Sequence, residues 1–164
     1  MGVELGLHDI RLGRYNRFVL EDNPVAIQPD MVGMVVRDMA AALRFYRLLG
    51  LAVPDGQDGE NYVEVITPNG YRISWNSLAM TRQIDPDFVE PVGQSLALAF
   101  KCDSPAQVDE TFARLTAAGY AGHKPPWDAF WGQRYAVITD PDGNHVDLFA
   151  PLQAFCGLVA AAVE

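Results

Sequence analysis

Histidine and acidic side chains can move protons or hold metal ions, and one such pair in this sequence is closely spaced. His145 lies two residues before Asp147, so a strand would place both on one face. The pair could bind a proton, a polar substrate group or a weakly held metal, or it could simply close a turn at the rim of a sheet. We interpret His8 and His123 as solvated or hydrogen-bonded histidines.

The aromatic run at residues 125–132 is the second feature with chemical potential. It places Trp127, Phe130 and Trp131 beside Asp128. Aromatic faces attract flat or cationic organic groups, and an acidic surround raises the local concentration of cations. The same rings could serve as packing anchors, so ligand contact and packing both remain open, with the ligand role favoured for Trp131.

Composition restricts the partners of the protein. With 164 residues, 49% of them hydrophobic, the chain has the make-up of one globular domain. The 21 acidic residues outnumber the 12 basic ones and give a net charge of −9, so nucleic acid and anionic membranes are poor partners. Cys102 and Cys156 lack metal-site spacing, and the sequence shows neither a secretory signal nor a bilayer-length apolar run. We therefore predict a cytoplasmic protein with reduced thiols.

An internal repeat organises the elements that must position these side chains. An apolar strand at 31–36 precedes a helix at 39–49, and a strand at 95–100 precedes a helix at 106–118. Asp38 and Ser104 are suited to cap the two helices at their N-termini. A hairpin follows each helix at a constant offset of 73 residues, which pairs Tyr62 with Tyr135 and Ser74 with Asp147.

This pattern predicts an α+β protein built from two tandem βαβββ modules. One further strand in each module, between the helix and the hairpin, is assigned to residues 51–55 and 120–124. The predicted organisation is an N-terminal extension at 1–27, a single domain at 28–152, and an apolar tail at 153–164. Within the domain, module one covers 28–79, a linker 80–93 and module two 94–152. The two end segments could cover a sheet edge or a subunit contact.

Strand alternation predicts which side chains line a groove. If Asp147 faces the groove, His145 and Tyr135 do so too, and the repeat adds Tyr62 and Glu64. The first strands then contribute small residues to the same face, namely Gly33, Ala97 and Ala99. Alternation places Trp75 on the opposite face of its strand, toward the core. Small side chains there leave volume for a ligand, although a partner strand exchanged between subunits could fill the same space.

Two sets of residues resemble the vicinal-oxygen-chelate superfamily, which includes glyoxalase I, extradiol dioxygenases and bleomycin-resistance proteins. They are Val36–Asp38 with Phe45–Gly50, and Trp131–Arg134 with Asp140–Asn144. The likeness covers about Gln28 to Leu152 and is greatest to the bleomycin-resistance branch. It implies a curved mixed sheet that forms a groove, helices on the convex side, and a homodimer whose modules could be swapped.

The resemblance also says where a metal would be held. The matching positions are Met31, Ser74, Ala97 and Asp147, of which only Asp147 is a good ligand for a hard divalent ion. Shifting the first strands by one step gives Gly33 or Ser95, which does not restore a ligand set. We therefore predict no metal and no cofactor.

These observations favour a metal-independent protein that sequesters a planar or cationic natural product, as in antibiotic resistance, over an enzyme. Its predicted ligand-binding residues are Tyr62, Glu64, Trp127, Phe130, Trp131, Tyr135, His145 and Asp147. One alternative is a lyase, isomerase or dioxygenase that uses relocated ligands (His145, Asp147 and Glu64) or metal-free proton transfer through His145. The other is a regulatory module whose groove takes a peptide or partner strand.

Overall fold

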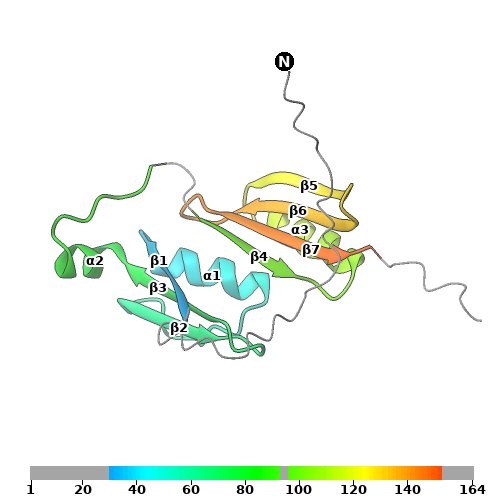
Figure 1. The fold of residues 1–164 in the computed structure, drawn as a ribbon. Coiled ribbons are helices and arrows are strands. Elements are labelled where there is room, and N and C mark those ends of the chain that lie inside the picture. The colour runs from blue at the N-terminus through cyan, green and yellow to red at the C-terminus, as the bar shows by residue number, and fades with distance from the viewer. Residues whose placement is uncertain (1–29, 93–95, 153–164) are drawn as a thin grey trace, which may run out of the picture.

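The computed structural model describes residues 30–92 and 96–152, which form two sheets, each with its own helix (Figure 1). The first sheet has the order β1-β3-β2, with β1 parallel and β2 antiparallel to β3. Its elements are β1 (Met31–Val36), α1 (Met39–Leu49), β2 (Tyr62–Ile66) and β3 (Arg72–Ser77), followed by α2 (Leu78–Ile84). The predicted end segments at 1–27 and 153–164, and with them His8 and Cys156, lie outside the described residues.

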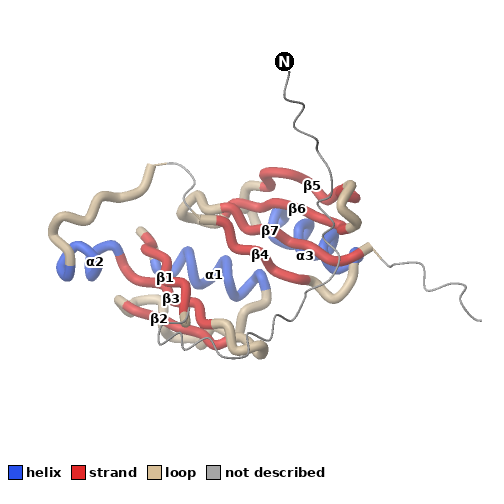
Figure 2. Tube along the Cα trace, in the orientation of Figure 1, coloured by secondary structure: helices blue, strands red, loops and turns tan. Residues whose placement is uncertain are grey.

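The second sheet repeats this plan with one more strand. Its order is β4-β7-β6-β5, with β4 parallel to β7 and the other pairs antiparallel. Figure 2 shows its four strands beside, and separate from, the first three. Its elements are β4 (Ala97–Lys101), α3 (Pro105–Ala117), β5 (Gly122–Ala129), β6 (Gln133–Thr139) and β7 (His145–Pro151). The α+β class and the tandem arrangement are confirmed.

The helix ends follow the predicted capping signals. The Asp38 carboxylate accepts the Ala41 N–H at 2.9 Å, and the Ser104 hydroxyl oxygen accepts the Gln107 N–H at 3.2 Å. At the end of α1, Gly50 adopts φ 119°, a left-handed conformation that glycine tolerates without steric cost. No helix in the described ranges combines the length and apolar character needed to cross a bilayer.

The prediction of a strand at residues 51–55 is wrong. The Arg47 guanidinium donates to the Val53 carbonyl at 3.3 Å and to the Pro54 carbonyl at 2.6 Å, so a side chain uses these backbone acceptors. Proline has no N–H for a ladder, and the Val53 N–H turns back to the Leu51 carbonyl at 2.8 Å. The first module is therefore βαββ, and the predicted linker begins inside α2.

The corresponding strand of the second module exists and is longer than predicted. It continues into the aromatic run and ends at Ala129, with register shifts between Gly122 and Lys124 and between Lys124 and Trp127. The second shift spans two consecutive prolines, which cannot donate to the neighbouring strand. These bulges change which side chains of β5 point to the open face.

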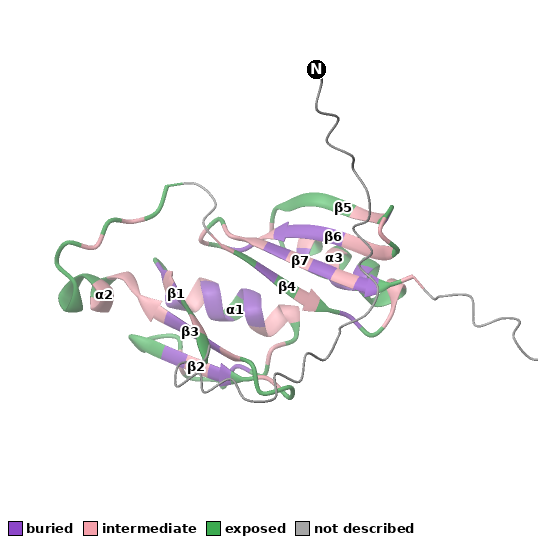
Figure 3. Cartoon of the chain, viewed as in Figure 1, coloured by how far each residue is buried: buried purple, intermediate pink, exposed green. Residues whose placement is uncertain are grey.

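The core lies between the sheets and their helices, as the alternation predicts (Figure 3). Val146, Leu148 and Trp75 are fully buried, while Ala97 and Ala99 are exposed. The contacts that join the two modules include one buried and one exposed hydrogen bond. The Tyr46 hydroxyl donates to Asp140 Oδ2 at 3.0 Å, and the Arg37 N–H donates to Asp142 Oδ1 at 3.0 Å.

Candidate functional site

The open face of the second sheet collects most of the residues that the sequence predicts to bind ligand. Strand pairing sets Trp127 beside Tyr135, and Tyr135 beside Phe149. One step along, Val137 pairs with Asp147, and Asp147 with Ala99. Because residues two apart on a strand share a face, these side chains form one surface.

Aromatic rings make up one end of this surface. The ring centroid of Tyr135 lies 5.2 Å from Trp127, 5.6 Å from Trp131 and 6.1 Å from Phe149. Phe130 meets Trp131 edge-on at 4.9 Å and is itself 98% exposed. We call these five rings the aromatic surface. A cluster that leaves one ring wholly in solvent has apolar area available for a partner.

A lysine already uses part of the aromatic surface. Lys124 Nζ lies 3.6 Å from the centroid of the Trp127 ring, in cation–π geometry. On the neighbouring ring, Trp131 Nε1 donates to Gln133 Oε1 at 2.9 Å, which fixes the indole plane. The Lys124 contact demonstrates that a Trp127 face is accessible to a positively charged group.

Asp147 lies next to the rings and interacts with Tyr135. Burial, followed by the hydrogen bond to Asp147 and its negative charge, raises the pKa of the Tyr135 hydroxyl to about 12. The His145 ring lies 4.2 Å from the His123 ring, centroid to centroid. Strand alternation does not predict His123 at this position, because the register of β5 shifts between Gly122 and Lys124.

Tyr62 and Glu64 are placed together on the first sheet, within a polar network. The Tyr62 hydroxyl donates to Glu64 Oε2 at 2.5 Å, and Arg72 donates to both Glu64 oxygens at 2.8 Å. Arg72 also forms an ion pair with Asp30. Hydrogen bonds from Arg72 first, and then from Tyr62, lower the pKa of Glu64 to about 2. The Glu64 carboxylate is thus already neutralised by a guanidinium.

A cavity of about 530 Å³ lies where the first module meets the second sheet. The turn after β2 contributes Thr67 and Tyr71, and β4 contributes Ala97, Ala99 and Lys101, with Phe149 adjoining them. This size is in the range of small-molecule sites. None of the eight predicted ligand-binding residues lines this cavity, but it adjoins the aromatic surface through Phe149.

The residues at the family's metal positions do not fit a metal. The register sets Gly33 opposite Ser74 and Ala99 opposite Asp147, so Asp147 remains the one strong ligand. Ser95 lies outside the described residues. Within residues 30–92 and 96–152, no three His, Cys, Asp or Glu side chains are gathered as a metal site would need. The relocated set of His145, Asp147 and Glu64 is accordingly not assembled.

Residues 28–148 match the model of the Glyoxalase/Bleomycin resistance protein/Dioxygenase superfamily, and the chain belongs to that superfamily. A glyoxalase/bleomycin resistance protein/dioxygenase family enzyme from Burkholderia phytofirmans has TM-score 0.66 and 23% identity, over 75% of this chain and 98% of that one. A glyoxalase/bleomycin resistance protein/dioxygenase from Nocardioides has TM-score 0.63 and 24% identity, over 83% and 92%. An uncharacterised protein of Mycobacterium tuberculosis is 25% identical over 158 residues, 91% of this chain and 90% of its own. The likeness to the bleomycin-resistance branch stays a prediction.

Proposed function

We propose that the protein binds a planar, positively charged organic molecule on the aromatic surface and sequesters it without a metal. The observation that carries the proposal is the chain of ring contacts from Phe130 to Phe149, open to solvent at Phe130 and bordered by Asp147. Stacked rings supply area for a flat ligand, and a carboxylate supplies charge. No bond is made or broken, because tight binding alone lowers the free concentration of the ligand.

Charge within this surface determines its preference. Asp147 carries a negative charge beside the rings, while Lys124 occupies one face of Trp127. An incoming cation would take the place of Lys124 on the indole, since both are attracted by the same ring face. Tyr62 and Glu64, whose polar atoms already bond to each other and to Arg72, are left out of the proposed contact surface.

The test is calorimetric titration at pH 7.5 with two probes of the same ring size, proflavine, which is cationic, and acridine, which is neutral. We expect proflavine to bind more tightly than acridine, with the same affinity in the presence and absence of EDTA. Trp131→Leu should weaken proflavine about tenfold, because it removes a stacking partner and its cation–π attraction. Lys124→Gln should strengthen proflavine about threefold by freeing the Trp127 face.

The matched controls are Phe88→Leu, a ring in the segment that follows α2, and Arg82→Gln, an exposed arginine of α2 in the first module. Both should leave proflavine affinity within about twofold of the parent protein. The proposal fails if Trp131→Leu binds proflavine as the parent does. It fails equally if EDTA abolishes binding and a divalent ion restores it.

The close approach of His123 and His145 favours proton transfer as a second candidate function. Asp147 shares the face of His145, two residues away, so an acid and a base could act on one bound molecule. Proton abstraction by a catalytic base is tested by incubating candidate carbonyl compounds with the protein in deuterated water. NMR then monitors the exchange of their acidic C–H protons for deuterium. Exchange that His145→Gln abolishes and His8→Gln preserves would favour the enzyme over the binding protein.

We also propose that the protein is a homodimer. The proposal rests on the resemblance of the chain to a superfamily in which dimers are usual. Sedimentation velocity across a hundredfold range of concentration measures it directly. A single species of 18.0 kDa throughout that range would contradict the proposal.

A further inference from the structure

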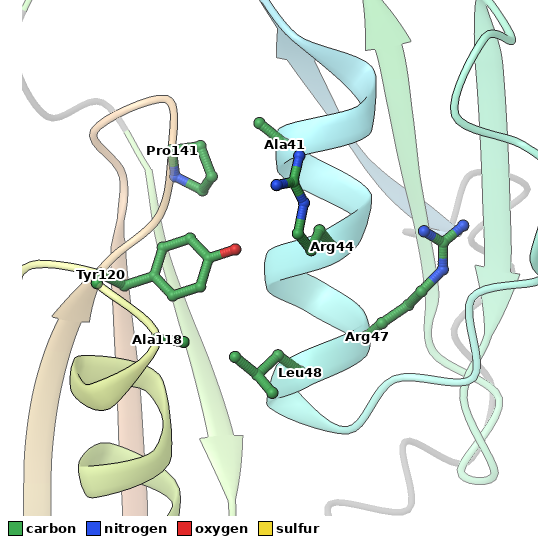
Figure 4. Close-up of a pocket in the computed structure, with 8 residues that line it drawn as sticks. Ala41, Arg44, Arg47, Leu48, Ala118, Tyr120 and Pro141 are labelled. Carbon is green, nitrogen blue, oxygen red and sulfur yellow. The ribbon is translucent and has the colours of Figure 1, made fainter.

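A second and larger cavity, of about 680 Å³, lies on the helix side of the molecule, between the two modules. One wall is α1, which contributes Ala41, Arg44 and Leu48. The other wall belongs to the second module, where Tyr120 follows α3 and Pro141 lies in the turn before β7. Figure 4 shows Arg44 and Tyr120 on opposite walls, with the Tyr120 hydroxyl directed toward α1.

Arg44 differs from most arginines in the described part of the chain. An ion pair with a carboxylate is formed by Arg37, Arg47, Arg72, Arg82 and Arg134. Within residues 30–92 and 96–152, the Arg44 guanidinium has no hydrogen-bond or ion-pair partner. In a protein with a net charge of −9, where carboxylates are abundant, a cation left unpaired beside a cavity is available to an anion.

The neighbouring arginine is not available in this way. Arg47 also borders the cavity, but its guanidinium bonds to Asp58 at 2.8 Å and to the Pro54 carbonyl at 2.6 Å. Figure 4 shows its head group turned away from Tyr120 and Pro141. The cavity therefore presents one free positive charge rather than two.

The remaining walls suit an apolar body. Leu48, Pro141 and the Tyr120 ring provide apolar area, and the Tyr120 ring is held edge-on against the buried Phe45 ring at 4.9 Å. A fixed ring presents a preformed surface, which lowers the entropic cost of binding. Tyr120 adds one hydroxyl, which has no partner among the described residues and can donate to an acceptor beside the arginine.

We propose that this cavity binds a small organic anion, a single carboxylate carried on an aromatic or apolar body. The carboxylate pairs with the Arg44 guanidinium, which can donate two parallel hydrogen bonds, and accepts a third from the Tyr120 hydroxyl. The body packs on Leu48, Pro141 and the Tyr120 ring. This site lies on the opposite side of the sheets from the aromatic surface and selects the opposite charge, so it is independent of the function proposed above.

The test uses 1-naphthoate as the probe and 1-naphthamide as its neutral counterpart, titrated by calorimetry and by amide NMR spectra of the full chain. We expect 1-naphthoate to bind at least tenfold more tightly than the amide, and to shift amide signals of α1 and residues 118–121. Arg44→Gln should weaken 1-naphthoate about tenfold or more, since a charge-assisted bidentate contact is lost. Tyr120→Phe should weaken it about threefold.

Lys101→Gln is the matched control, because it removes one exposed positive charge elsewhere and should leave 1-naphthoate affinity within about twofold. Trp131→Leu should likewise leave 1-naphthoate unchanged, which separates this site from the aromatic surface. Circular dichroism checks that Arg44→Gln is folded, as expected for an exposed side chain. The proposal is overturned if Arg44→Gln binds 1-naphthoate as tightly as the parent protein does. It is overturned likewise if the parent binds 1-naphthamide as tightly as 1-naphthoate, or if the amide shifts are confined to β6 and β7.

Discussion

The open faces of the two sheets show what the duplicated modules share and where they have diverged. Equivalent positions, 73 residues apart, carry Tyr62 and Tyr135, Glu64 and Val137, Arg72 and His145, and Ser74 and Asp147. In both modules the tyrosine interacts with an acidic side chain, Glu64 in the first and Asp147 in the second. The backbone plan is repeated, but the chemistry built on it is not.

The first face pairs its carboxylates with an arginine, whereas the second sets its carboxylate beside aromatic rings. On the first sheet Arg72 forms ion pairs with both Glu64 and Asp30. On the second sheet, aromatic rings replace the arginine network beside Asp147. The comparison teaches that a ligand-binding face need not be symmetric across a duplication, and it locates the proposed binding in the second module.

The turns before β3 and β7 should differ most in their contribution to stability. Asp140 is buried and accepts four hydrogen bonds, from the Tyr46 hydroxyl and from Asp142 and Asn144. Asp140→Ala should therefore lower the free energy of unfolding by about 3 kcal/mol, because buried donors lose their acceptor. The equivalent change, Thr67→Ala, should cost under about 1 kcal/mol, since its hydroxyl bonds only within an exposed turn. Urea denaturation measures both, and equal losses would remove the distinction.

The paired tyrosines should differ next in ligand binding. Tyr135→Leu should weaken proflavine about tenfold, because it removes the ring that contacts Trp127, Trp131 and Phe149. The matched change Tyr62→Leu should leave the affinity unchanged. Calorimetric titration compares the two variants. A similar loss in both would mean that the binding surface spans both modules, as the sequence predicts.

The Arg72 network should make stability depend on acid pH. The pKa of Glu64 falls from an ordinary value near 4.3 to about 2, so its contribution is present above about pH 4.3 and is lost as pH falls toward 2. Glu64→Gln should be less stable than the parent at pH 7, and this difference should shrink between about pH 4.3 and 2. Urea denaturation at several pH values measures the difference, with Glu60→Gln as the exposed control. A difference that is constant with pH would be the contrary result.

The smallest effect should appear in the titration of the two tyrosines. The pKa of Tyr135, about 12, is raised mainly by burial, so Asp147→Asn should lower it only part of the way to 10. The pKa of Tyr62 is raised mainly by its hydrogen bond to Glu64, so Glu64→Gln should remove most of that shift. Tyrosine Cζ chemical shifts report both. If Asp147→Asn returned the pKa of Tyr135 to 10, the charge of Asp147 rather than burial would be the principal cause of the shift.

Local signals account for much of the fold. Caps such as Asp38 and Ser104, and the turn sequences of the hairpins, act over a few residues and can therefore be found in the sequence. The strand predicted at residues 51–55 fails because the Arg47 side chain, from the last turn of α1, takes the carbonyl groups of Val53 and Pro54. Strand propensity alone does not reveal that a side chain will occupy these backbone acceptors.

The candidate sites likewise contain residues that the sequence predicts and residues that it does not. Tyr135 and Asp147 follow from alternation along regular strands, and the structure sets them in adjoining positions of one face. The position of His123 does not follow, because the irregularity between Gly122 and Lys124 changes the alternation at that residue. The cavity at Arg44 does not follow from the sequence, since one wall is α1 and the other is formed by Tyr120 and Pro141, more than 70 residues away along the chain.

Trp75 has a consequence for observing this protein with light. Its indole is fully enclosed, and its N–H has no acceptor among the described residues, while Trp127 and Trp131 sit at the partly open edge of the second sheet. The fluorescence of Trp75 should have a short emission wavelength and be little quenched by acrylamide, whereas acrylamide should readily quench Trp127 and Trp131. One emission spectrum therefore contains two reporters. The enclosed indole reports unfolding of the first module, and the edge pair reports ligand binding to the rings.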